Sequence, residues 1–119
     1  MGKIKETSTN FENKNILSTK CDQYYAANII GGQWTLIICC QLAEGVMRFG
    51  EFKKSIPNIT ERMLTLQLRK MKENNLIKGT VYAQVPPKVE YELTPIGKEL
   101  IPILEQLGDW GERHKNIKK

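Results

Sequence analysis

The chain has very few of the residues from which catalytic and metal-binding sites are built. Its 119 residues include one histidine, His114, and three cysteines, none of which forms a CxxC pair. Zinc sites need His and Cys ligands at defined spacings, and nucleophilic catalysis needs a base beside the nucleophile. Because neither arrangement can be built from the local sequence, we expect no metal, no cofactor and no catalytic activity.

Long hydrophobic runs are also missing. No stretch approaches the roughly 18 apolar residues that a membrane-spanning helix needs, and residues 1–20 lack the hydrophobic segment of a secretory signal. We therefore expect a cytoplasmic protein with no membrane partner, whose odd number of cysteines stays reduced instead of forming a disulfide framework. With 40% hydrophobic residues, the chain fits one domain with its own core.

Positive charge is concentrated in the middle of the chain. Residues 48–88 carry nine Lys and Arg against three Asp and Glu, whereas the segments on either side are close to neutral. This one segment therefore accounts for the formal net charge of +5. Such a local excess is typical of a surface that binds a polyanion, although a solvated basic face would give the same count.

The folded domain is expected to span residues 21–114, between two tails. Residues 1–20 are rich in Lys, Asn, Thr and Glu, and we expect them to form a polar tail that is at most partly helical. Residues 115–119 are expected to form a short basic tail at the other end.

Two helices are predicted at the start of this domain. Apolar residues recur at helical spacing after Asp22, which we interpret as the N-cap of a helix that ends at Gly31. The following run, residues 34–43, is apolar on nearly all sides, and its length favours a buried helix over a buried strand. Cys39 and Cys40 lie in this run, and we interpret both as core residues.

The basic segment predicts a helix, a tight turn and a second helix. A helix over residues 49–56 is stopped by Pro57, and Thr60 is the predicted N-cap of a second helix that runs to about Asn74. The large apolar residues of the second helix recur on one face, which we expect to point inward. These residues are Leu64, Leu68 and Met71.

A β-hairpin is predicted directly after the second helix. β-branched and aromatic residues indicate strands over residues 76–83 and 89–93, joined by a loop that Pro86 and Pro87 stiffen. A helix-turn-helix followed by a hairpin is the winged-helix plan. The sequence therefore predicts an α+β, mostly α fold: a winged helix-turn-helix with a two-stranded β-hairpin wing and additional N- and C-terminal helices.

The last predicted helix begins at Thr94-Pro95 and reaches about His114. Pro102 is expected to kink it or to start a new segment. Its apolar residues are spaced alternately by four and three, which is closer to the repeat of a helix pair than to the broad face of a core helix. We interpret them as a candidate dimer interface, with packing in the chain's own core as the alternative. They are Ile96, Leu100, Ile103, Leu107 and Trp110.

The winged-helix plan suggests which residues would contact DNA. The second helix of the motif enters the major groove, and the hairpin tip rests on the flanking backbone. Arginine can bind guanine through two hydrogen bonds, an exposed leucine can contact a thymine methyl group, and lysines more often bind phosphates. The candidate DNA-binding residues are Thr60, Arg62, Thr65, Leu66, Arg69 and Lys70, with Lys53, Lys54 and, at the stiffened hairpin tip, Lys88; Lys72 is a further candidate for a phosphate contact.

Several segments in a fixed order resemble a known family. They are Cys21 with Tyr25 and Ala26, Ile30-Gly31-Gly32 with Trp34, Arg48-Phe49-Gly50-Glu51-Phe52, Met63-Leu64-Thr65 with Gln67-Leu68-Arg69, Val85-Pro86-Pro87-Lys88-Val89-Glu90-Tyr91 with Leu93-Thr94, Gly97, and Asp109-Trp110-Gly111. Together they resemble the HxlR-type transcriptional regulators of bacteria and archaea, relatives of the MarR group. The resemblance covers about residues 21–114.

The resemblance implies a homodimer that pairs through its terminal helices and binds double-stranded DNA at a palindromic operator. It also implies that Cys21 lies where several members carry a thiol that senses oxidants or electrophiles. A thiol just before a helix is favoured as the reactive thiolate by the positive helix end, while the neighbouring Asp22 opposes this effect. A free cysteine at the dimer surface is the alternative, and the sequence identifies no small-molecule effector.

Two other functions remain open. The first is a winged helix that docks on another protein without binding DNA. The second is a thiol enzyme built on Cys21. The basic segment coincides with the elements that would touch DNA, which argues against the first, and the lack of a base near Cys21 argues against the second.

Overall fold

The structure, a computed structural model, describes residues 21–118. The predicted N-terminal tail therefore lies outside the described residues. The chain divides into two units, Met1–Gly31 and Gly32–Lys119, and each is described by itself.

The described part of the first unit is helix α2, Asp22–Ile30. The helix was predicted, but the assignment of Asp22 as its N-cap is wrong: Cys21 occupies the cap position, in an extended conformation and without a side-chain cap bond. The carbonyl oxygen of Cys21 accepts the first helical hydrogen bond, from the Tyr25 amide at 3.0 Å. Asp22 instead lies in the first turn, where a negative charge interacts favourably with the helix dipole.

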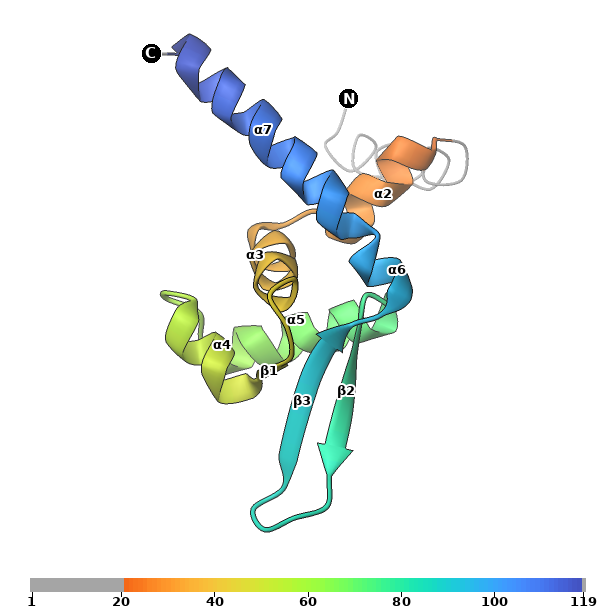
Figure 1. Cartoon of the computed structure of the whole chain (residues 1–119), viewed down its shortest axis with the longest axis vertical. Coiled ribbons are helices and arrows are strands. Elements are labelled where there is room, and N and C mark those ends of the chain that lie inside the picture. The colour runs from red at the N-terminus through yellow and green to blue at the C-terminus, as the bar shows by residue number, and fades with distance from the viewer. Residues whose placement is uncertain (1–20, 119) are drawn as a thin grey trace, which may run out of the picture. The chain divides into compact units, whose positions relative to one another are not determined.

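The second unit is a winged helix (Figure 1). Its elements are α3 (Gln33–Leu42), β1 (Met47–Arg48), α4 (Phe49–Ser55), α5 (Glu61–Glu73), β2 (Ile77–Tyr82), β3 (Lys88–Leu93), α6 (Pro95–Lys98) and α7 (Leu100–Lys118). The helix-turn-helix of α4 and α5 is followed by the hairpin of β2 and β3, which projects beyond both helices (Figure 1). The predicted α+β, mostly helical winged-helix fold is confirmed.

The sheet contains one strand more than the predicted hairpin. Its three antiparallel strands lie in the order β1-β3-β2, and β1 adds Arg48 opposite Glu90 and Met47 opposite Tyr91. A strand of two residues has no alternation of its own to reveal it. Its pairing places the start of α4 directly beside the hairpin.

Helix α3 buries one face and exposes the other. Ile38, Cys39 and Leu42 are buried, but Cys40 is exposed. The interpretation of Cys40 as a core residue is therefore wrong, although that of Cys39 is confirmed. Although the helix is apolar on most sides, its neighbours α7, β3 and α5 cover only part of its surface.

The core lies between α3, α4, α5 and the base of the hairpin. The predicted inward face of α5 is buried as expected, with Leu64, Leu68 and Met71 at most 2% exposed. Phe52 of α4 is fully buried, and its ring lies 6.2 Å from that of Tyr91 in β3. Apolar burial of this extent is the main term that holds the helix-turn-helix against the hairpin.

Two neighbouring isoleucines of α3 provide a test of this packing. Ile38 is 0% exposed and Ile37 is 38% exposed. We expect Ile38→Ala to lower the free energy of unfolding by about 2–5 kcal/mol, because it leaves a cavity in the core. Ile37→Ala, the matched control, should cost clearly less in the same chemical denaturation experiment. Equal losses would show that α3 is not oriented as described.

The C-terminal helix is broken close to its start. The Thr94 side chain caps α6 by accepting a hydrogen bond from the Gly97 amide at 3.1 Å, as predicted, and α7 starts as a new segment at Leu100. Pro102 is tolerated because it lies in the first turn of α7, where its missing N–H would have no partner within the helix. The helix continues to Lys118 rather than ending near His114.

Candidate nucleic-acid interface

The outward face of α5 carries the arginines that the sequence singled out. The Thr60 side chain caps the helix by accepting a hydrogen bond from the Met63 amide at 3.1 Å. Because one face of α5 is anchored in the core, the opposite face is held towards solvent. The residues that we call the recognition face are all exposed: Arg62, Thr65, Leu66, Arg69 and Lys70.

Leu66 is unusual in this surface because it is 50% exposed between Arg62 and Arg69. A single exposed leucine is common on protein surfaces. Its place among hydrogen-bonding side chains nevertheless suits a base edge, since an apolar group can contact the methyl group of thymine.

The two lysines of α4 differ in their surroundings. Lys54 is exposed, whereas Lys53 is half-buried and its Nζ donates a hydrogen bond to the Ile59 carbonyl at 2.8 Å. Lys53 therefore stabilises the turn between α4 and α5, and only its remaining donors could reach a phosphate.

Lys88 is not at the tip of the hairpin, where the sequence placed it. It is the first residue of β3, opposite Tyr82, and its side chain is 23% exposed. Its Nζ lies 3.4 Å from the Glu90 carboxylate and 4.7 Å from the centre of the Tyr82 ring. Glu90 also accepts a hydrogen bond from the Tyr82 hydroxyl, which raises the pKa of Tyr82. Lys88 is thus held by contacts within the hairpin.

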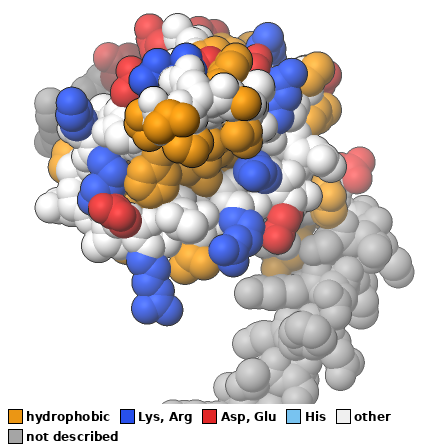
Figure 2. All heavy atoms as spheres, turned by 90° about the horizontal axis from the view of Figure 1, so that it is seen from below, with side chains coloured by type: hydrophobic (Ala, Val, Ile, Leu, Met, Phe, Trp, Pro, Cys, Tyr) orange, Lys and Arg blue, Asp and Glu red, His pale blue; other side chains and the backbone are white. Residues whose placement is uncertain are grey.

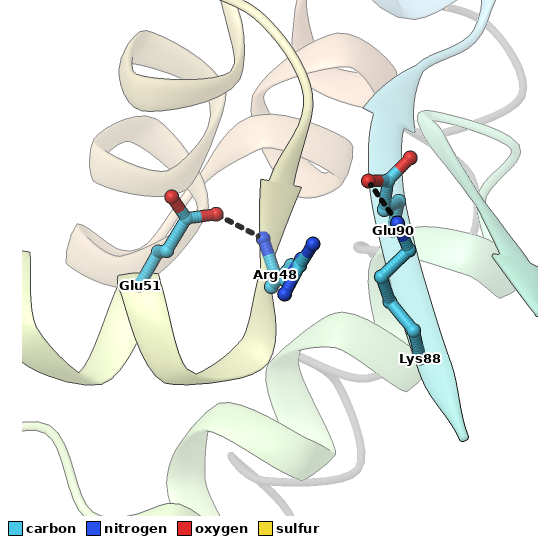
Figure 3. A network of polar contacts seen from close by, with 4 residues as sticks. All are labelled: Arg48, Glu51, Lys88 and Glu90. Atoms are coloured by element: carbon cyan, nitrogen blue, oxygen red, sulfur yellow. Dashed lines mark hydrogen bonds and ion pairs between the residues drawn. The ribbon is translucent and has the colours of Figure 1, made fainter. Parts of the chain in front are cut away.

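Arg48 is a further cation beside the hairpin, and it was not among the predicted DNA-binding residues. It is exposed in β1, and its backbone amide donates a hydrogen bond to Glu51 at 2.7 Å (Figure 3). Its place beside the hairpin follows only from the pairing of β1 with β3. The sequence could not reveal this position, although Arg48 is counted in the basic segment.

The face that contains the hairpin tip, seen along the hairpin in Figure 2, is mixed in character. Lys and Arg side chains lie around a central hydrophobic area, with fewer acidic side chains among them (Figure 2). The loop 83–87 itself carries no charge, and Val85 is fully exposed. The positive charge of this side therefore comes from the helices and strands around the loop.

The predicted seam is divided between α6, which carries Ile96, and α7, and most of it is exposed. Leu100 is half-buried, but the other four residues are 46–55% exposed. We call these four the apolar stripe: Ile96, Ile103, Leu107 and Trp110. Packing in the chain's own core, the alternative interpretation, does not account for them. The His114 ring stacks on that of Trp110, with 5.1 Å between centroids, and extends the stripe.

The three cysteines lie in different environments. Cys39 is buried, and burial together with the neighbouring Cys40 raises the pKa of its thiol to about 11. Cys40 is exposed. Cys21 is half-buried at the start of α2, and its Sγ donates a hydrogen bond to the Gln23 side chain at 3.6 Å. Cys39 is therefore the least reactive of the three, since the thiolate is the nucleophile.

Within residues 21–118, no three His, Cys, Asp or Glu side chains are grouped so that they could hold a metal ion. None of the helices described there is both long and apolar enough to cross a membrane.

Comparisons with known proteins agree with this geometry. Residues 29–119 match the HxlR-like helix-turn-helix family. The HTH-type transcriptional regulators YybR and YdeP of Bacillus subtilis (strain 168) are 44% and 48% identical over 108 and 96 residues, which are 89% and 81% of this chain and 86% and 75% of theirs. The redox regulator HypR in its reduced form has a TM-score of 0.74 and 44% identity, covering 78% of this chain and 92% of that chain. The protein therefore belongs to the HxlR family of helix-turn-helix transcriptional regulators.

Proposed function

We propose that this regulator binds a palindromic DNA operator as a homodimer, with α5 in the major groove. The observation that carries the proposal is the division of α5 into two faces. Leu64, Leu68 and Met71 anchor one face in the core, while Arg62 and Arg69 are exposed on the other. Arginine side chains held in this way can bind guanine through two hydrogen bonds.

The dimer would set the geometry of the operator. The apolar stripe of α6 and α7 supplies the surface for pairing, and two copies of α5 would then enter successive major grooves. The half-sites should lie about 34 Å apart, or a multiple of that distance. The four exposed apolar side chains of the stripe support this arrangement, because apolar area of this kind is normally covered by a partner.

The operator can be found by selecting the genomic fragments that the protein protects from nuclease. Binding to the selected duplex is then measured by fluorescence anisotropy at several salt concentrations, with a shuffled duplex as the control. We expect tight, salt-sensitive binding to a short inverted repeat. No binding to any duplex at low salt would contradict the proposal and favour a protein-docking winged helix.

Cys21 is the residue that we propose for a redox response of this regulator. HypR, to which the chain is similar, is described as a redox regulator. The physical support lies in position: Cys21 is half-buried at the start of α2, whereas Cys40, although more exposed, lies near the end of α3, and Cys39 is buried with its pKa raised to about 11. The thiol of Cys39 is therefore an unsuitable sensor.

Diamide, an oxidant of thiols, tests the role of Cys21. We expect it to change the operator affinity of the wild-type protein but not that of Cys21→Ser, measured by anisotropy before and after treatment. Cys40→Ser is the matched control, because Cys40 is an exposed thiol elsewhere in the chain. An equal change in wild type and Cys21→Ser would place the sensor elsewhere, and no change in either would exclude control by thiol oxidation.

A further inference from the structure

Two adjoining hollows lie between the recognition helix and the hairpin. The first, about 210 Å³, lies between α5 and β3 and is lined by Arg69 and Lys72 among others. The second, about 440 Å³, lies between the start of α4 and the hairpin loop, with Arg48 and Lys88 in its lining. Phe49 and Tyr91 line both hollows, so the two adjoin, and together we call them the groove.

The floor of this groove is fixed by the core. Tyr91 packs against the fully buried Phe52, and it is paired with Met47 on one side and Gly79 on the other. A Cβ at Gly79 would lie 3.2 Å from the Tyr91 ring, which shows how closely the ring is packed. The Tyr91 ring, which lines both hollows, is therefore held in place by the sheet and the core.

The cations of the groove differ in whether they already form ion pairs within the protein. The Lys88 ammonium is already bound to Glu90 and lies over Tyr82. Glu90 faces Arg48 across the sheet, but its carboxylate pairs with Lys88 (Figure 3). In the part of the chain that the structure describes, no ion pair involves Arg48, Arg69 or Lys72. Arg48 is thus an unpaired cation of the hollow beside the hairpin loop, and Arg69 and Lys72 line the hollow beside α5.

We propose that this groove holds the sugar-phosphate backbone of the DNA and that Arg48, rather than Lys88, binds a phosphate on the hairpin side. The proposal rests on the proposed function, in which α5 lies in the major groove and the hairpin rests on the flanking backbone. The strand that borders the major groove must then pass between these two elements. The groove lies there and carries cations on both walls.

Lys88 has a different task in this arrangement. Its contacts with Glu90 and Tyr82 hold the Tyr82–Lys88 pair in place, and this pair of opposite residues lies next to the proline-containing loop. It thereby positions the hairpin, while the guanidinium of Arg48 provides the charge and the forked donors that match a phosphate. The contact carries no sequence information, because it is made to the backbone.

The salt dependence of DNA binding tests this assignment. For Arg48→Gln, the slope of log Kobs against log[salt] should become shallower by about 1.8, because a homodimer loses one phosphate contact in each protomer and each contact accounts for about 0.9. Between 50 and 200 mM salt, the affinity advantage of the wild type should therefore shrink about 12-fold. Arg48→Lys should restore the slope, and Lys88→Gln should change it less than Arg48→Gln does.

Lys78→Gln is the matched control, since Lys78 is an exposed cation of the same sheet that lines neither hollow. It should keep the wild-type slope. A thermal unfolding curve for each variant shows whether it is folded. A second measurement uses operators in which a single phosphate is replaced by a neutral methylphosphonate. Replacement at the contacted phosphate should weaken binding by the wild type but not by Arg48→Gln.

The possible results separate this inference from the proposed function. The assignment of Arg48 would be overturned if folded Arg48→Gln kept the wild-type salt dependence. It would also be overturned if Lys88→Gln changed the slope more than Arg48→Gln does. In both cases DNA binding itself would stand. If the wild-type protein bound no duplex at all, the proposed function would fail, and the groove assignment with it.

Discussion

The double variant Arg62→Ala/Arg69→Ala is expected to lose about 2–6 kcal/mol of binding at each operator half-site, which is about thirtyfold to 10⁴-fold in the Kd for a single half-site. Each arginine that grips a guanine through two hydrogen bonds contributes about 1–3 kcal/mol of base discrimination. The two side chains are exposed on one face of α5, seven residues apart. That spacing is about two helical turns, so both can reach the same major groove.

The control must separate base reading from simple charge. Lys78→Ala/Lys98→Ala removes the same net charge from exposed positions outside α5. Anisotropy titrations of operator and shuffled duplex with both double variants give the comparison. The arginine variant should lose the difference between the two duplexes, whereas the lysine control should keep it. Full operator affinity in the arginine variant would show that α5 is not the reading element.

The two elements that carry this prediction could be recognised in the sequence because their signals are local. Thr60 can cap only the helix that follows it, and Leu64 and Leu68 lie one turn apart on one face. The hairpin is marked by two β-rich runs around a pair of prolines. Such features depend on residues that are close along the chain, and the structure confirms them.

The features that sequence reasoning missed depend on how strands pair and how helices pack, and not on the spacing of residue types along the chain. Arg48 lies beside the hairpin only because β1 pairs with β3. Lys88 is held by Tyr82, the residue opposite it, and by Glu90, the next residue on the same face of β3. The exposure of Cys40 follows from which side of α3 its neighbours leave uncovered. None of these relations changes the local pattern of the sequence, so only the tertiary structure reveals them.

The start of α2 shows how a local rule can also mislead. Asp is a frequent N-cap, and Asp22 lies directly before the apolar residues of the helix. Asp is also favoured in the first turn, because of the helix dipole. Both positions suit the same side chain, and they differ by one residue. The structure selects the second, which puts Cys21 at the cap position without a side-chain cap hydrogen bond.

The variant Ile103→Glu/Leu107→Glu is expected to be monomeric and to bind the operator about 10²–10⁴-fold more weakly than the wild type. This is the affinity lost when the two DNA-binding domains of a dimer are no longer linked. Both residues belong to the apolar stripe and lie one turn apart on α7. Two carboxylates there would have to be buried without partners in any dimer that uses the stripe, and this costs several kcal/mol. The second half of α7 extends beyond the rest of its unit, so it can reach another copy (Figure 1).

Light scattering during size exclusion gives the mass, and anisotropy gives the affinity for a full operator and for a single half-site. The variant should bind both duplexes with similar weak affinity, whereas the wild type should prefer the full operator. Gln106→Glu adds a carboxylate at an exposed position of α7 outside the stripe and should remain dimeric. A dimeric double variant would place the interface on another surface, and a monomeric wild type would leave a palindromic operator unexplained. The affinity ratio between full operator and half-site therefore measures directly how much of the recognition depends on pairing through α7.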